Sequence, residues 1–247
     1  MFKHIYYPIL TQIGPIRIFT FGFFVAIGVI TAILLASKYA KKKNIPPEKI
    51  QTLSLFIIIG GILSSRLIHI IQSQEIPITD FFMIWDGGLS WFGGVLGGSL
   101  FAYIYIKHQK LKFLELTDIY SIPIILGLLI GRLGCFFGDG GHVGRLTNVP
   151  WGVLIDGEIR HWTVLYSFVL LIPMLLILLK LKTNRRFTGF LTASTMIMYG
   201  FGRFIIDIFR IDPRFFSLTV AQYGSIIIFI LGVYILYNGR NKTANNS

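Results

Sequence analysis

The chain has 247 residues, of which 54% are hydrophobic and only 14% are charged, with 22 phenylalanines and a formal net charge of +12. This composition is too apolar for an ordinary soluble domain and is typical of a polytopic membrane protein. A single cysteine excludes an internal disulfide framework and a cysteine-rich metal site, and we expect neither a metal centre nor a cofactor.

Apolar segments recur along the whole chain. A helix needs about 20 mostly apolar residues to cross the hydrocarbon core of a membrane. Seven segments meet this requirement, at 17–37, 51–72, 88–106, 118–138, 163–179, 189–209 and 218–237. We therefore predict an all-α fold of about seven transmembrane helices, with residues 1–247 forming a single integral-membrane domain.

The basic residues indicate how these helices are oriented. Most of the 23 Lys and Arg residues fall in blocks on alternate loops, after the first, third, fifth and seventh segments: Lys38, Lys41, Lys42, Lys43, Lys49, Lys107, Lys110, Lys112, Lys180, Lys182, Arg185, Arg186, Arg240 and Lys242. Cytoplasmic loops carry such an excess, so we predict an external N-terminus and a cytoplasmic C-terminus. The net charge then reflects orientation and contact with anionic lipid rather than nucleic-acid binding.

Several ionisable residues lie inside the predicted helices. In this orientation they share one level, the outer half of the bilayer: Arg66, His69, Arg132, Arg203 and Asp207. An arginine in the hydrocarbon costs roughly 2.5–3.5 kcal/mol even on the lenient insertion scale. One interpretation is snorkelling, in which long side chains near a helix end reach the head groups. The other is a polar chamber that opens outward.

The spacing of these residues favours an anion site. Arg203, Asp207 and Arg210 are spaced i, i+4, i+7 and share one helix face. Arg132 opens, in this interpretation, a loop whose glycines let backbone N–H groups approach an anion. Guanidinium groups suit bidentate phosphate binding, and Asp207 can orient Arg203. We predict a phospholipid head group from the outer leaflet as the ligand.

Six motifs, in order along the chain, resemble those of the prolipoprotein diacylglyceryl transferases: IRIFTFGFFVAIG, SSRLIHI, IWDGGLSWFGGVLGG, GRLGCFFGDGGHVGRLTNVPWGV, HWTVLYS and YGFGRFIIDIFRID. The resemblance implies a seven-helix transferase domain in the bacterial plasma (inner) membrane. It also implies an enzyme that moves the diacylglyceryl group of phosphatidylglycerol to the lipobox cysteine of a prolipoprotein signal peptide and releases glycerol phosphate.

The chain keeps some of the residues that are functional in this family and has lost others. Arg132 matches the arginine of the family signature, and Arg203 with Asp207 matches a late Arg–Glu pair, the carboxylate being kept but shortened. Other polar positions are lost: the histidine of the family's GG-x-S-x-H-GG run is Phe92, a tyrosine is Phe21, and the signature asparagine is Cys135. The chain therefore looks like a diverged member whose phosphate-binding residues are retained.

Transfer of a glyceryl carbon to a thiol needs a base for the thiol and positive charge for the departing phosphate. We predict that Arg132, Arg203 and Arg66 bind the phosphate, with Arg203 and Asp207 acting in catalysis. Candidates for the base are His142, Asp139, His69 and His161. We interpret Cys135 as a packing residue rather than a nucleophile.

Two alternatives remain open at the level of sequence. A diverged relative could transfer a phospholipid-derived group to another acceptor, which would explain the loss of the histidine at Phe92. A non-enzymatic phospholipid-binding or transport protein could use the same fold, although no inverted repeat indicates a transporter.

Overall fold

The structure, a computed structural model, describes residues 2–3, 6–14, 16–73, 77–82, 90–138, 144–155, 157–184 and 186–244. The chain divides into two compact units, each described by itself. Unit 1 comprises Met1–Leu34 and Thr117–Ser247, and unit 2 comprises Leu35–Leu116.

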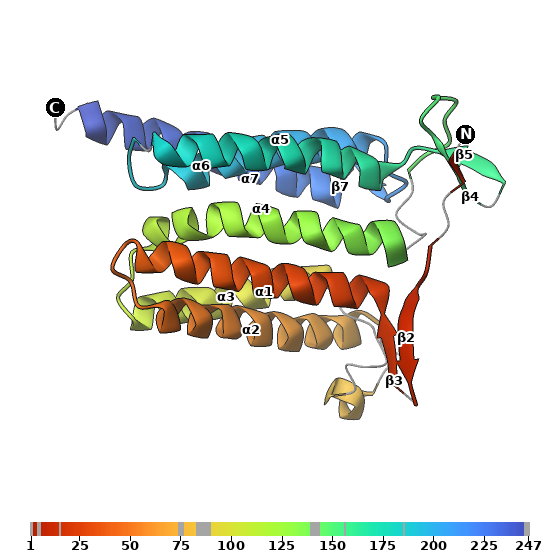
Figure 1. Cartoon of the computed structure of the whole chain (residues 1–247), viewed down its shortest axis with the longest axis horizontal. Helices are drawn as coiled ribbons and strands as arrows, with labels where there is room; N and C mark the ends of the chain where they lie inside the picture. Colours follow the sequence, from red (N-terminus) through yellow and green to blue (C-terminus); the bar gives the residue numbers. More distant parts are fainter. Residues whose placement is uncertain are drawn as a thin grey trace. The chain divides into compact units, whose positions relative to one another are not determined.

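Helices account for most of the described residues. Seven α-helices occur there, close to the predicted segments: α1 Thr20–Lys41, α2 Pro47–Ser73, α3 Trp91–His108, α4 Phe113–Gly138, α5 Thr163–Thr183, α6 Phe190–Ile208 and α7 Val220–Ala244 (Figure 1). Of these, α1, α2, α4, α5 and α7 are long and apolar enough to cross a membrane. The predicted helical fold is confirmed, whereas the orientation in the membrane stays a prediction.

Short strands, which the sequence analysis did not predict, connect some of the helices. Strands β1 (Phe2–Lys3), β4 (Val153–Ile155) and β5 (Glu158–Arg160) form a sheet in the order β1-β4-β5. Two antiparallel pairs complete the set, β2 (Ile9–Ile13) with β3 (Ile16–Phe19), and β6 (Arg214–Phe215) with β7 (Leu218–Thr219). The pairs β2–β3 and β6–β7 lie directly before α1 and α7, so they fix where these helices begin.

Within unit 1, α1 and α4 approach closely along a row of glycines. A Cβ atom added to Gly28 would lie 2.6 Å from the carbonyl oxygen of Gly127, and one added to Gly138 would lie 2.8 Å from the backbone nitrogen of Phe21. Gly134 faces the carbonyl oxygen of Phe21 in the same way, at 3.0 Å. Small residues at such contacts let two helix backbones approach in a membrane. These glycines therefore allow α1 and α4 to pack closely.

The N-terminus of α6 is held by a carboxylate from α4. Asp118, which is buried, accepts hydrogen bonds from the backbone N–H groups of Gly189 (2.8 Å) and Thr192 (2.9 Å) and from the Thr192 hydroxyl (2.8 Å). The first N–H groups of a helix have no partner inside the helix, so an external acceptor stabilises them. Asp118 therefore fixes the start of α6 against α4.

Unit 2 is built on the pair α2 and α3. Glycines again allow the contact, since a Cβ on Gly60 would meet the ring of Phe101 at 2.3 Å, and one on Gly97 would meet Ser64. Ser65 donates its hydroxyl to the carbonyl of Ser90 (2.6 Å), just before α3 begins. The short helix η1 (Ile78–Phe82) lies between the two long helices in sequence.

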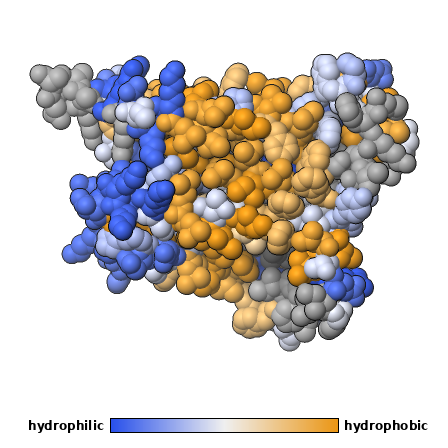
Figure 2. Space-filling model, in the orientation of Figure 1, coloured by the Kyte–Doolittle hydropathy of each residue, from blue (hydrophilic) through white to orange (hydrophobic). Residues whose placement is uncertain are grey.

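The surface agrees with a membrane environment. Figure 2 shows a hydrophobic band over the middles of the helices and hydrophilic residues beyond it. In unit 1 the side chains of Val169, Leu176 and Ile227 are more than half exposed. A soluble monomer rarely exposes apolar patches of that extent, so lipid is the solvent that fits this band.

Candidate functional site

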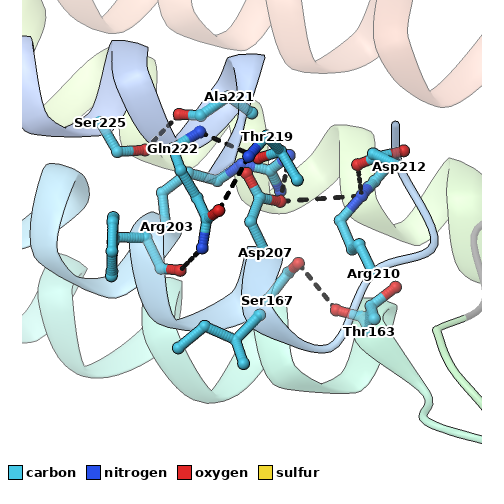
Figure 3. A network of polar contacts seen from close by, with 12 residues as sticks. Thr163, Ser167, Arg203, Asp207, Arg210, Asp212, Thr219, Ala221, Gln222 and Ser225 are labelled. Atoms are coloured by element: carbon cyan, nitrogen blue, oxygen red, sulfur yellow. Dashed lines mark hydrogen bonds and ion pairs between the residues drawn. The ribbon is translucent and has the colours of Figure 1, made fainter. Parts of the chain in front are cut away.

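A buried ion pair on α6 forms the centre of the candidate site in unit 1. The Nη2 of Arg203 lies 2.9 Å from Oδ1 of Asp207, one helical turn later, and the Asp207 side chain is fully buried. The Nε of Arg210 is 3.7 Å from the same oxygen. Figure 3 shows these residues converging where α6 ends. The predicted shared face of Arg203, Asp207 and Arg210 is confirmed, with Arg210 two residues beyond the helix.

A second carboxylate holds Arg210. Asp212 accepts two hydrogen bonds from its guanidinium, from Nε at 2.7 Å and from Nη2 at 3.3 Å. Because Asp212 binds Arg210 in this bidentate manner, Asp207 is left mainly to Arg203. Planar guanidinium–carboxylate pairing fixes direction as well as charge, so Asp207 holds Arg203 in one orientation.

The start of α7 supports α6 behind this ion pair. Thr219 and Gln222 form a reciprocal cap, in which the Gln222 side chain accepts from the Thr219 N–H (2.9 Å) and the Thr219 hydroxyl accepts from the Gln222 N–H (3.1 Å). This is the capping box expected from a T-x-x-Q sequence at a helix start. Gln222 also donates to the carbonyl of Phe204 (3.4 Å), next to Arg203 (Figure 3).

Arg132 lies inside α4, six residues before the helix ends, so the expectation that it opens a loop was wrong. The run stays helical because Gly131, Gly134 and Gly138 serve the contact with α1 instead of forming a turn. Backbone N–H groups in a helix interior are bonded within the helix. Anion binding at this point therefore depends on the guanidinium of Arg132, whose Nη1 lies 3.8 Å from the Cys135 sulfur.

Arg132 and Arg203 line one small pocket, which we call the arginine pocket. It is narrow, with a volume of about 10 Å³, and is lined by Leu128, Arg132, Ser167, Leu170, Leu171, Tyr199, Arg203 and Ile206. Arg132 and Arg203 therefore line a common pocket, and guanidinium groups are suited to bind phosphate oxygens. Counting Arg132, Arg203 and Arg210 against Asp207 and Asp212, this described cluster has one positive charge in excess.

An apolar groove lies between α1 and α4. This α1–α4 groove, of about 400 Å³, is lined by Phe21, Val25, Gly28, Val29, Ala32, Ile124, Gly127, Leu128, Gly131, Arg132 and Cys135. It shares Leu128 and Arg132 with the arginine pocket. A groove with apolar walls and an arginine at one end fits an amphiphile with acyl chains and a phosphate.

A second apolar groove, of about 520 Å³, lies between α5 and α6. This α5–α6 groove is lined by Val149, Trp151, His161, Tyr166, Val169, Leu170, Phe201, Gly202, Ile205, Ile206 and Phe209. It shares Leu170 and Ile206 with the arginine pocket. Among the described residues of unit 1, both the α1–α4 groove and the α5–α6 groove thus share lining residues with the arginine pocket.

His161, just before α5, forms hydrogen bonds at the margin of the α5–α6 groove. Its Nδ1 lies 2.8 Å from the hydroxyl oxygen of Tyr166, which also accepts the indole N–H of Trp151 at 3.0 Å. Burial lowers the pKa of His161 below its ordinary value, which favours the neutral imidazole. Its role as a base stays a prediction.

Two other predicted site residues belong to unit 2. The side chain of Arg66 on α2 is buried, and its Nη2 donates to the carbonyl of Asp80 in η1 at 2.9 Å. His69 lies one turn later on α2, where it is half-buried. Phosphate binding by Arg66, base catalysis by His69 and one chamber shared with unit 1 therefore stay predictions.

Asp139 and His142 lie outside the described residues. Residues that flank them are placed: Gly138 contacts α1, and Gly144 pairs with Arg210 through an isolated β-bridge. Arg145 follows, with its N–H bonded to the carbonyl of Phe209 at 2.8 Å. The chain after α4 thus returns to the end of α6, beside the Asp207 ion pairs.

Cys135 and the position of the lost histidine can also be located. The Cys135 side chain is buried at the margin of the α1–α4 groove, which agrees with its interpretation as a packing residue. Phe92 is the second residue of α3.

Within the described part of the chain, no three His, Cys, Asp or Glu side chains gather as a metal site would need.

Sequence reasoning missed several residues of this site. Tyr199 lines the arginine pocket and is spaced i, i−4 from Arg203, so helical periodicity could have found it. Asp212 follows Arg210 by two residues, and the sequence alone did not predict it as the partner of Arg210. Trp151 and Tyr166 come together across a loop, and the sequence carries no spacing that indicates this contact.

Comparison with known proteins gives consistent matches over almost the whole chain. Residues 8–238 match the family model described as prolipoprotein diacylglyceryl transferase. Two relatives are both named phosphatidylglycerol–prolipoprotein diacylglyceryl transferase. The protein from Streptococcus pneumoniae (strain JJA) is 34% identical over 253 residues, which cover 95% of each chain. The protein from Clostridioides difficile (strain 630) is 30% identical over 235 residues, which cover 94% of each chain.

Proposed function

The chain belongs to the prolipoprotein diacylglyceryl transferase family, and from this premise we infer that it is an enzyme that transfers a diacylglyceryl group from phosphatidylglycerol to a prolipoprotein. The arginine pocket indicates which residues of the chain would take part in this reaction. There Arg132 and Arg203 line one cavity, and Arg203 is paired with the buried Asp207.

In the reaction that we propose, the thiolate of the acceptor cysteine attacks the glyceryl carbon of phosphatidylglycerol. A carbon–sulfur bond forms, the carbon–oxygen bond to the phosphate breaks, and glycerol phosphate leaves with the electron pair. The thiol proton passes to a base. Negative charge therefore grows on the leaving phosphate, and positive groups placed beforehand at that position stabilise the transition state.

Arg132 and Arg203 are the groups that we assign to this phosphate. Both guanidiniums can donate two parallel hydrogen bonds to phosphate oxygens. Asp207 keeps Arg203 in position before substrate arrives, so little reorganisation is needed during the reaction. The one excess positive charge of the cluster suits an anion that carries a single charge in the lipid and a greater one after release.

The α1–α4 groove is the place that we assign to the acyl chains of phosphatidylglycerol. Its walls are mostly apolar, and it shares Leu128 and Arg132 with the arginine pocket. Gly28 and Gly127 line it where α1 and α4 approach closely.

Three finer predictions accompany this function. The chain is expected to form one integral-membrane domain in the bacterial plasma membrane, with the N-terminus outside and the C-terminus in the cytoplasm. The basic loop residues support that orientation, together with the exposed apolar side chains of the helices. His142 is the first candidate for the base that takes the thiol proton, with Asp139 as an alternative, and Arg66 stays a predicted ligand of the phosphate.

A purified-protein assay tests the proposed function. Vesicles of phosphatidylglycerol and a synthetic signal peptide with a lipobox cysteine are incubated with the protein, and the peptide mass is followed. We expect a thioether-linked diacylglyceryl peptide together with an equal amount of glycerol phosphate. Unmodified peptide, with a relative from Streptococcus pneumoniae active in the same preparation, would disprove the transferase assignment.

A further inference from the structure

The hydrogen bonds around Tyr166 fix the position of the proton on His161. The indole nitrogen of Trp151 can only donate, so the Tyr166 oxygen accepts its N–H at 3.0 Å. A phenol that accepts from Trp151 keeps its own O–H for donation, and Nδ1 of His161 lies within reach as an acceptor. Tyr166 therefore donates to Nδ1 of His161 across the 2.8 Å contact.

It follows that His161 carries its proton on Nε2. A neutral imidazole has one donor and one acceptor nitrogen, and here the acceptor is taken by Tyr166. The ring of Phe209, whose centroid is 4.8 Å from that of His161, packs beside it and limits its rotation. His161 thus brings an oriented hydrogen-bond donor, without a positive charge, to the margin of the α5–α6 groove.

The chemistry of the α5–α6 groove excludes a phosphate as its natural occupant. Among the described residues that line it, none is Lys, Arg, Asp or Glu, whereas the α1–α4 groove contains Arg132. Burying a phosphate without a cation is unfavourable. The α5–α6 groove fits an apolar occupant that offers a hydrogen-bond acceptor but no charge, such as a peptide backbone with apolar side chains.

The two grooves share different lining residues with the arginine pocket. The α1–α4 groove shares Leu128 and Arg132 with the pocket, and the α5–α6 groove shares Leu170 and Ile206. Substitution at carbon requires the nucleophile to arrive on the side opposite the leaving group, and a separate groove for each substrate is compatible with this geometry.

We propose that the α5–α6 groove binds the apolar segment of the acceptor signal peptide, and that the Nε2–H of His161 donates a hydrogen bond to a backbone carbonyl of this peptide. The proposal rests on the proposed function, which supplies the two substrates. A signal peptide contains an apolar region of about 7–15 residues, and that region gives the groove an uncharged occupant. His161 is then a specificity residue for the acceptor and not the base.

Steady-state kinetics with lipobox peptide and phosphatidylglycerol micelles test the role of His161. The variant His161→Phe keeps an aromatic ring without the donor, and we expect the KM for peptide to rise about five- to tenfold, as for one lost hydrogen bond. The variant His161→Gln restores an N–H near Nε2, and its peptide KM should return to within about twofold of wild type. The KM for phosphatidylglycerol should not change in either variant.

A matched pair of variants tests the groove itself. Val169 lines the groove and Leu176 lies two turns further along α5, and both side chains are exposed, to 67% and 62%. Val169→Trp should fill the groove and raise the peptide KM, while Leu176→Trp should have no effect. A rise in the phosphatidylglycerol KM instead, or equal behaviour of the two tryptophan variants, would overturn the proposal in favour of a lipid site or of no site.

Photocrosslinking separates this proposal from the transferase assignment. A benzophenone amino acid in place of Phe201, another groove residue, should capture radiolabelled lipobox peptide, and unlabelled peptide should compete. If wild type lipidates the peptide but residue 201 never captures it, this proposal alone fails. If capture occurs but no lipidated peptide forms, the proposed function fails and the peptide groove stands.

Discussion

The fully buried carboxylate of Asp207 lies 2.9 Å from the guanidinium of Arg203, one turn earlier on the same helix. A buried carboxylate is unfavourable in an apolar region unless it is paired. The pair thus explains how α6 carries an arginine to the level of the arginine pocket. It also makes separate predictions for each partner.

The first prediction concerns the shape of the arginine side chains. Arg203→Lys and Arg132→Lys keep the charge but lose the bidentate geometry, so transferase activity should fall about tenfold or more, equivalent to roughly 1.5–3 kcal/mol. Arg160→Lys is the matched control, because Arg160 pairs with Glu158 outside the arginine pocket and should keep full activity. Arginines that merely reach the head groups would tolerate lysine at all three positions.

The second prediction concerns Asp207. Asp207→Asn leaves Arg203 without its carboxylate, so we expect the free energy of unfolding to fall by about 3–5 kcal/mol and activity to fall with it. Asp212→Asn removes a carboxylate that is 37% exposed, and this change should cost less than about 1 kcal/mol. Thermal unfolding in detergent and the peptide assay measure both quantities. Equal losses in the two variants would contradict a special role for Asp207.

The third prediction concerns the contact between α1 and α4. In Gly28→Ala the new Cβ would lie 2.6 Å from the Gly127 carbonyl oxygen, so the helices must separate, at a cost of about 1–3 kcal/mol. Gly22→Ala is the control on the same helix, because nothing lies within 4 Å of its added Cβ. Thermal unfolding should show a lower midpoint for Gly28→Ala only. An unchanged midpoint would mean that the close contact does not stabilise the fold.

The fourth prediction concerns the orientation in the membrane. Reporter fusions at Lys42 and Lys110 should give a cytoplasmic signal, and a fusion at Gly157 should give an external one. Lys43 and Glu115 form an ion pair of 3.7 Å in unit 2, which places the loops after α1 and α3 at the same end of that unit. An external signal at Lys110 would reverse the orientation and remove the outer-leaflet site.

The fifth prediction concerns the base. His142→Ala should lower transferase activity by the 10²–10⁴-fold that is typical of losing a general base, while His69→Ala serves as the comparison in unit 2. Phe92→His restores the residue that the family has at this position and should change activity little if His142 already serves. Full activity in His142→Ala would refute this assignment, and a large gain in Phe92→His would point to the lost histidine instead.

The sequence predicted the helices well because lipid imposes a minimum apolar length on each one. All seven predicted segments overlap described helices, and the Arg203–Asp207 contact followed from helical periodicity alone. The partners between helices could not be predicted in this way. Nearly every face of α1 or α5 is apolar, so hydrophobic periodicity does not indicate which face meets a neighbour and which meets lipid.

Two details illustrate this limit. The glycines around Arg132 suggested a loop, because glycine is permissive in turns, yet in α4 they serve a contact with α1 that depends on residues about a hundred positions earlier. The proton of His161 is placed through Tyr166, which accepts the N–H of Trp151 and contacts Nδ1 of His161. The contact between Trp151 and Tyr166 depends on how the loop before α5 folds back. Neither relation has a signature within one segment.

The carboxylate of Asp118 has a consequence for biogenesis. Residues of α4 are synthesised some seventy positions before the N–H groups of Gly189 and Thr192 that Asp118 accepts. During insertion from the ribosome, these hydrogen bonds between α4 and the start of α6 can therefore form only after residues 189–192 have emerged. The assembly of these two helices is thus coupled in time, and a nascent chain halted before residue 189 cannot yet close this part of the fold.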